Sequence, residues 1–174
     1  RISVTDRCDL RCVYCMKEDM EFLPKSKILS SEEINYICST FIDLGIKKIR
    51  ITGGEPLIKK GMPTILDYLG KKINNSNLEE LTLTTNGTQL YKYAEVIKKN
   101  GVKRINVSLD TLDSKKYLKI TRGGNLEKVL EGLNIAKKIG LKVKINTVAL
   151  KNININELGK MVDWCINKKF NITF

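Results

Sequence analysis

The stretch Lys48-Ile-Arg-Ile-Thr-Gly-Gly-Glu-Pro56 alternates aliphatic and polar residues and then breaks at two glycines. Such alternation is typical of a β-strand with one apolar face, because successive side chains point to opposite sides. We therefore predict a strand over Lys48–Thr52, with Ile49 and Ile51 on its buried face. The glycine pair predicts a turn in which the backbone comes close to another group.

Five further stretches have the same β-rich character, and helical patterns lie between them. The predicted strands are Ile2–Thr5, Lys48–Thr52, Glu80–Thr84, Arg104–Leu109, Lys142–Ala149 and Asn171–Phe174. The predicted helices run from a Ser30–Glu33 capping box to Gly45, follow Pro63, and include Ala94–Lys99, Leu126–Ile139 and Asn156–Lys168. Strands that alternate with helices indicate a parallel α/β fold. An antiparallel sheet with one wet face also alternates, but helices between nearly all the strands disfavour it.

The other faces of these strands are polar and partly cationic. Their residues are Arg1, Ser3, Thr5, Lys48, Arg50, Thr52, Thr82, Thr84, Asn106, Ser108, Asp110, Lys144 and Asn146. A closed eight-stranded barrel fills its interior with branched aliphatic side chains, and a chain of 174 residues is short for eight strand–helix units. We therefore expect a parallel (βα)6 partial TIM barrel whose inner face suits a charged ligand.

The composition narrows the range of partners. The net charge is +12, which suits a polyanionic ligand or a well-solvated surface. Aromatic residues are only 6% and do not interleave with a basic block, so we expect no nucleic-acid platform. The sequence shows no signal peptide or membrane span, and its lysine-rich, disulfide-poor composition predicts a cytoplasmic protein. It begins with Arg1 and ends inside a strand-like run, so we expect both ends to be cuts through a longer protein.

Three cysteines lie close together in Cys8-Asp-Leu-Arg-Cys-Val-Tyr-Cys15. A [4Fe–4S] cluster held by three thiolates keeps one iron open for a substrate or cofactor, and this spacing favours such a site. Zinc is the alternative, but it needs a fourth ligand and the chain has no histidine. The other two cysteines, Cys38 and Cys165, fall at helical spacing among apolar residues, and we expect them in the core.

The cysteine loop and the Gly-Gly-Glu-Pro turn together resemble the radical S-adenosylmethionine (SAM) enzymes. The resemblance implies that the turn holds the aminocarboxylate end of SAM beside the open iron. The cluster would then supply an electron, and SAM would yield a 5′-deoxyadenosyl radical that abstracts hydrogen.

Four segments extend the likeness to a narrower family: Arg1–Cys8, Ile49–Leu57, Leu83–Gly87 and Ile105–Asp110. They resemble the GTP 3′,8-cyclases of molybdenum cofactor biosynthesis, lyases that convert GTP to 3′,8-cyclo-7,8-dihydro-GTP. The resemblance implies cluster ligands Cys8, Cys12 and Cys15, SAM contacts Tyr14, Gly53, Gly54, Glu55 and Ser108, and GTP contacts Arg1, Lys48, Arg50, Thr84 and Lys144. It implies no catalytic residue beyond the cluster and SAM.

The same resemblance carries expectations about partners and about the rest of the protein. Residues 1–174 would be the radical SAM core domain, and a C-terminal domain with a second [4Fe–4S] cluster would be absent from this chain. The fragment alone is expected to turn over GTP poorly or not at all. The implied partners are a reductant such as flavodoxin or ferredoxin, the cyclic pyranopterin synthase that acts next, and a second copy in a homodimer. Two alternatives remain open: a radical SAM maturase that acts on a peptide or protein, and a non-catalytic metal-binding module.

Overall fold

The computed structural model describes the backbone of all 174 residues and every side chain except that of Asn74. The strands are β1 (Ile2–Ser3), β2 (Lys48–Thr52), β3 (Glu80–Thr85), β4 (Arg104–Ser108), β5 (Lys142–Asn146) and β6 (Asn171–Thr173). The α-helices are α1 (Ser31–Asp43), α2 (Met62–Asn75), α3 (Leu90–Lys99), α4 (Ser114–Thr121), α5 (Leu126–Lys138) and α6 (Leu158–Lys168). Short 3-10 turns are η1 (Lys25–Lys27), η2 (Pro56–Ile58) and η3 (Ile155–Glu157).

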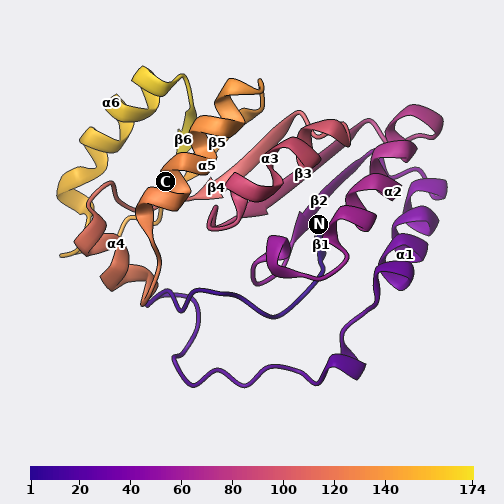
Figure 1. Cartoon of the computed structure of the whole chain (residues 1–174), viewed down its shortest axis with the longest axis horizontal. Helices are drawn as coiled ribbons and strands as arrows, with labels where there is room; N and C mark the ends of the chain where they lie inside the picture. Colours follow the sequence, from indigo (N-terminus) through magenta and orange to yellow (C-terminus); the bar gives the residue numbers. More distant parts are fainter.

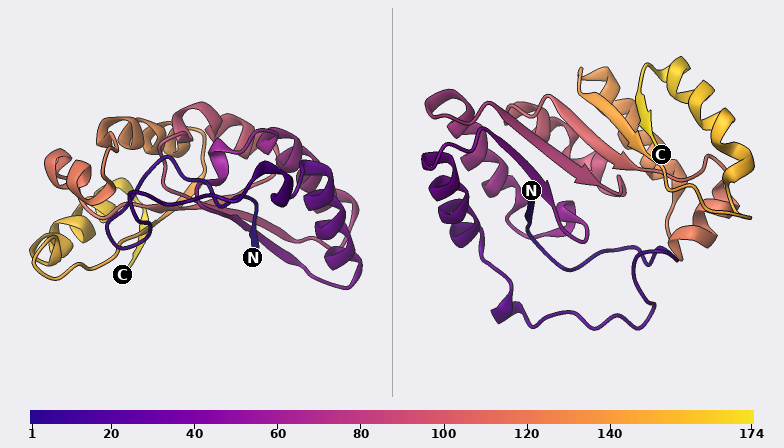
Figure 2. Two further views of the ribbon diagram at one scale, coloured as in Figure 1. Left: turned by 90° about the horizontal axis from the view of Figure 1, so that it is seen from below. Right: turned by 180° about the vertical axis from the view of Figure 1, so that it is seen from behind.

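The six strands form one parallel sheet in the order β1-β2-β3-β4-β5-β6. The sheet is bent, and the helices lie along the outer side of the bend while the inner side is left open (Figure 2). This arrangement confirms the expected (βα)6 partial barrel. The first and last strands do not meet to close the barrel, since the strand order ends at β1 and β6.

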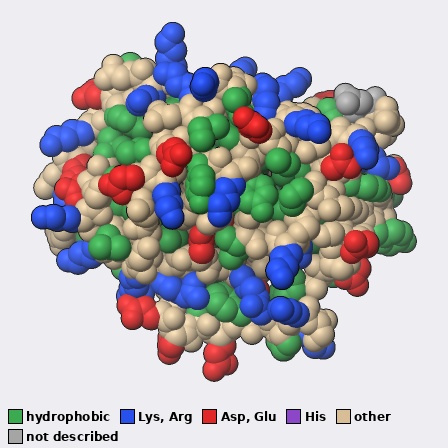
Figure 3. All heavy atoms as spheres, in the orientation of Figure 1, with side chains coloured by type: hydrophobic (Ala, Val, Ile, Leu, Met, Phe, Trp, Pro, Cys, Tyr) green, Lys and Arg blue, Asp and Glu red, His purple; other side chains and the backbone are tan. Residues whose placement is uncertain are grey.

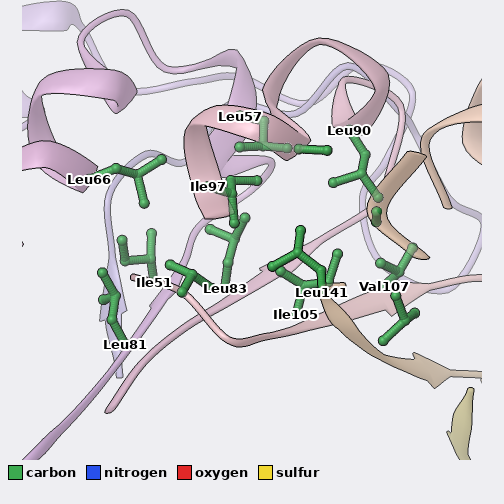
Figure 4. Packing of buried hydrophobic residues seen from close by; sticks show 14 of the residues in the cluster. Ile51, Leu57, Leu66, Leu81, Leu83, Leu90, Ile97, Ile105, Val107 and Leu141 are labelled. Atoms are coloured by element: carbon green, nitrogen blue, oxygen red, sulfur yellow. The ribbon is translucent and has the colours of Figure 1, made fainter. Parts of the chain in front are cut away.

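The core lies between the sheet and its helices. The register places Ile2, Ile51, Leu83, Ile105 and Val143 in one row across five strands. Helical side chains such as Leu66, Leu90 and Ile97 pack onto these strands (Figure 4). The alternation therefore assigned the buried face correctly. Cys38 and Cys165 are also buried in this core, as expected.

The helix ends follow local sequence signals. Ser30 and Glu33 form the expected capping box, in which each side chain accepts the other residue's backbone N–H. Helix α4 was missing from the sequence prediction because it is short and lysine-rich; it ends at Arg122, in a left-handed conformation just before Gly123. Its N-cap is Asp113, which accepts a hydrogen bond from the N–H of Lys116.

The predicted strand Lys142–Ala149 is too long by three residues. It ends at Asn146 because the N–H of Val148 donates to the Asp110 carboxylate at 2.8 Å instead of to a neighbouring strand. The segment between β1 and α1 contains the three-cysteine loop and passes beside α4 before it returns to α1 (Figure 1). Among the described helices, none is both long and apolar enough to cross a membrane.

Candidate functional site

The loop that carries the cysteines is held first by the end of β2. The N–H of Gly54 donates to the carbonyl of Thr5 at 2.7 Å, and the N–H of Glu55 donates to Arg7 at 2.8 Å. A Cβ atom at Gly54 would overlap the carbonyl oxygen of Arg7, and one at Gly53 would lie 2.8 Å from the Thr5 carbonyl. The glycine pair thus allows close approach of the protein's own backbone, which positions the start of the loop.

Glu55 ties the same turn to the end of β3. Its side chain is fully buried and accepts hydrogen bonds from the Leu57 N–H, the Thr85 hydroxyl and the Asn86 N–H at 2.6–2.9 Å. Burial raises the pKa of Glu55 to about 7, while these three hydrogen bonds lower it. The Glu55 side chain therefore links the turn after β2 to the end of β3. Its contact with SAM stays a prediction, and any effect of Glu55 on SAM binding would come from the turn that it stabilises.

The far end of the loop is held by β4 and α4. The Tyr14 hydroxyl donates to Oδ2 of Asp110 at 2.6 Å. The N–H groups of Arg11 and Val13 donate to carbonyls at the end of α4. Strand ends far apart in the sequence therefore fix both sides of the loop, and the ring of Tyr14 remains 41% exposed beside them.

The three thiols differ in their surroundings. Cys8 and Cys12 are partly buried, and Cys15 is exposed. Burial raises the pKa of Cys12 to about 12, with a further contribution from the charge of Asp110, and burial likewise raises the pKa of Cys8. Without positive charge nearby these two thiols stay protonated, so their use as ligands is coupled to binding of a cation or cluster.

The three free thiols of the loop are the kind of donor that an iron–sulfur cluster takes. Among the described residues, no three His, Cys, Asp or Glu side chains gather closely enough to hold a single metal ion. The Tyr117 hydroxyl is buried and has no hydrogen-bond partner in the described part of the chain. Burial raises its pKa, and so do the nearby charges of Cys12 and Asp9, which places this hydroxyl close to the cysteine loop. A bound cluster would offer it sulfur acceptors.

Three of the predicted substrate residues come together on the open face of the sheet. Arg1, Lys48 and Arg50 line a hollow of about 320 Å³ that includes the start of β2 and β3. Among the described side chains, neither Arg1 nor Arg50 forms an ion pair with a carboxylate. Their charges are therefore available to an anionic ligand.

One acidic residue, Glu80, also lines this hollow and was not predicted from the sequence. Glu80 lies 3.7 Å from Lys48 and 3.1 Å from Arg104, measured between carboxylate oxygen and nitrogen. Extending the strand alternation by one step, from Thr82 back to Glu80, places it on the inner face. Lys48 is thus partly neutralised, and the hollow is less cationic than the sequence predicted.

The remaining predicted residues lie on the same face, nearer the other edge of the sheet. Thr84, Asn106 and Lys144 are register partners across β3, β4 and β5, and Asn106 donates to the Thr84 hydroxyl at 3.5 Å. Ser108 is two pairs farther along, opposite Asn146. The residues predicted for GTP, together with Ser108, therefore lie on the open face of the sheet, whereas Tyr14 lies in the cysteine loop and Gly53–Glu55 in the turn after β2.

A sequence profile of the Radical SAM superfamily matches residues 2–165. The chain belongs to the radical SAM superfamily. This membership confirms the cofactors expected from the loop, a [4Fe–4S] cluster and SAM.

The chain is similar to curated proteins in sequence and to solved structures in fold. The GTP 3′,8-cyclase of Bradyrhizobium diazoefficiens is 56% identical over 173 residues, and that of Paracoccus denitrificans is 49% identical over 174 residues. These alignments cover 99% and 100% of this chain but 50% of each relative, so the chain spans about half their length. Among solved structures, Streptococcus suis SuiB bound to S-adenosylmethionine has a TM-score of 0.81 at 24% identity, over 97% of this chain and 37% of SuiB. The structural likeness supports the radical SAM fold alone.

Proposed function

We propose that the protein of which this chain forms the radical SAM core domain is a GTP 3′,8-cyclase, a lyase of molybdenum cofactor biosynthesis. The observation that carries the proposal is the cationic hollow of Arg1, Lys48 and Arg50 on the open face of the sheet. Curated cyclases align with this chain along nearly its whole length, which supports the same activity.

The geometry suits a nucleoside triphosphate that lies along the strands. The hollow includes the first residue of β2, whereas the glycine turn and cysteine loop lie beyond its last residue, Thr52. Four residue steps along a strand span roughly 13 Å. A triphosphate bound in the hollow would therefore extend its ribose toward the loop, past Thr84.

Different residues of the chain would then hold the cluster, SAM and GTP. Cys8, Cys12 and Cys15 would hold the cluster, which supplies the electron for cleavage of SAM. Tyr14, the Gly53–Glu55 turn and Ser108 would place SAM beside it. The cations Arg1, Lys48, Arg50 and Lys144 would bind the triphosphate through charge-assisted hydrogen bonds, as Thr84 would through its hydroxyl.

The proposal also covers the rest of the full-length protein and its partners. The full-length protein would carry a second cluster beyond residue 174, receive electrons from a flavodoxin or ferredoxin, and act in the cytoplasm, as a homodimer. Its product would pass to the cyclic pyranopterin synthase.

Binding to the reconstituted chain tests the site directly. We expect GTP to bind more tightly than guanosine, and Arg50→Ala to weaken GTP binding about tenfold, the loss of one charge-assisted contact. Lys47→Ala is the matched control, because Lys47 is exposed, pairs with Glu79 and lies outside the hollow. Equal binding of GTP and guanosine, or SAM cleavage stimulated by a peptide and not by GTP, would count against the cyclase and favour a maturase.

A further inference from the structure

Asn86 follows β3 and lies against the first cysteine of the loop. Its side-chain Nδ2 is 3.6 Å from Sγ of Cys8 and 2.8 Å from Oδ1 of Asp9. The backbone N–H of Leu10 is 3.5 Å from the same sulfur. In the described part of the chain, Cys8 is the one loop thiol that receives a side-chain hydrogen bond.

The surroundings fix which end of the Asn86 amide faces the sulfur. Its Oδ1 accepts the N–H of Thr88 at 2.9 Å, and the Asp9 carboxylate on the other side can only accept. A flipped amide would oppose oxygen to the carboxylate and NH₂ to the Thr88 N–H. Nδ2 must therefore point toward Asp9 and Cys8.

The rest of the network keeps this amide in place. Thr88 Oγ1 lies 2.6 Å from Asp9 Oδ2 and 2.8 Å from Asn86 Oδ1. The Asn86 backbone N–H donates to the buried carboxylate of Glu55 at 2.6 Å. The backbone of Asn86 is thus fixed to Glu55, and its amide cannot turn away from the loop without breaking its hydrogen bonds with Asp9 and Thr88.

We propose that Asn86 is a positioning residue that donates a hydrogen bond to the Cys8 thiolate and thereby raises the reduction potential of the bound cluster. Hydrogen bonds to ligand sulfurs stabilise the more negative, reduced cluster, and they are among the factors that set its potential. The inference rests on the proposed role of Cys8 as a cluster ligand and adds a residue that controls electron uptake.

The test is a redox titration of the anaerobically reconstituted chain, followed by electron paramagnetic resonance of the reduced cluster. Asn86→Leu keeps a similar shape without a donor. At a fixed applied potential, we expect it to lower the ratio of reduced to oxidised cluster about tenfold. For one electron this is a shift of about 59 mV to more negative values. Thr88→Val is the matched control, because it loosens the same network without removing the donor to sulfur, and its potential should stay at the parent value.

The possible outcomes distinguish failure of the proposed role of Asn86 from failure of the proposed cluster site. An unchanged potential in Asn86→Leu, or equal shifts in Asn86→Leu and Thr88→Val, would overturn it. If Asn86→Leu does not take up iron, Asn86→Ser is titrated with the same expectation. Loss of iron from both Asn86 variants while Thr88→Val retains it would assign Asn86 to holding the loop and would also overturn the tuning role. A parent chain that binds no iron and sulfide would instead refute the cluster site.

Discussion

The hydroxyl of Tyr14 donates a 2.6 Å hydrogen bond to Asp110, a residue 96 positions farther along the chain. This contact joins the cysteine loop to the end of β4. The other oxygen of Asp110 accepts the Val148 N–H, so one carboxylate also connects the loop to the segment that follows β5. Tertiary contacts within the chain therefore position the loop.

Tyr14→Phe should lower the free energy of unfolding of the metal-free chain by about 1–3 kcal/mol. It leaves a buried carboxylate oxygen of Asp110 without its donor. Urea unfolding under reducing conditions measures the loss. Tyr36→Phe, at a site 75% exposed on α1, should change nothing, and an equal loss in both variants would refute this role of Tyr14.

Gly54→Ala should destabilise the chain by about 1–3 kcal/mol and reduce the iron bound after reconstitution, because the new Cβ would overlap the Arg7 carbonyl. Iron content and thermal unfolding provide the two readouts. The control is Gly159→Ala, where nothing lies within 4 Å of the added atom. Normal iron binding in Gly54→Ala would show that the close approach at this turn is not needed.

The charge of Glu55 should make the metal-free chain less stable as the pH rises. Burial raises its pKa from an ordinary 4.5 to about 7, so the folded state holds a proton that the unfolded state releases between these values. The contribution of this group is fully present below pH 4.5 and is lost as the pH rises toward 7, by about 3 kcal/mol. Denaturant unfolding at several pH values measures the slope. Glu55→Gln does not titrate, so a slope as steep in this variant as in the parent would assign it to other groups.

Tyr117→Phe should stabilise the metal-free chain by about 1 kcal/mol, because it removes a buried hydroxyl that has no partner in the described residues. With the cluster bound, the gain should vanish or reverse. Thermal unfolding with and without reconstitution gives both values. Tyr68→Phe should instead lower stability, since the Tyr68 hydroxyl bonds to Ser39 at 2.6 Å. A destabilised metal-free Tyr117→Phe would contradict the expectation.

Glu80→Gln should tighten GTP binding about two- to fivefold. It removes the carboxylate that pairs with Lys48 and Arg104 at the hollow, and partly exposed charge pairs of this kind are worth roughly 0.2–1 kcal/mol. Isothermal titration calorimetry at low salt checks the affinity. Glu79→Gln, which alters the exposed pair with Lys47, should leave it unchanged. Weaker GTP binding in Glu80→Gln would mean that Glu80 organises the hollow rather than competing for its cations.

Positive charge is spread over the surface and does not identify the site. Lysine and arginine side chains are scattered over the face shown in Figure 3, among acidic and apolar ones. What distinguishes Arg1 and Arg50 is their position on the open side of the sheet together with their lack of an ion pair among the described side chains. Net charge alone could not have selected them.

The sequence by itself determined the parallel sheet, its buried face and the cysteine loop. Period-two alternation, glycine turns and cysteine spacing are local signals that need no knowledge of distant partners. Helix α4 was missed because its segment is short and lysine-rich, although an N-cap aspartate precedes it and a glycine pair follows it.

Only the tertiary structure decided what holds the loop and what competes for the cations. The contacts of Asn86 with Cys8, of Tyr14 with Asp110 and of Glu80 with Arg104 join residues 24 to 96 positions apart. Parallel strands bring such residues together at the ends and on the inner face of one sheet. Their separation along the chain does not predict that they are in contact. The register of the folded sheet is therefore the physical reason that these contacts could not be read from the sequence.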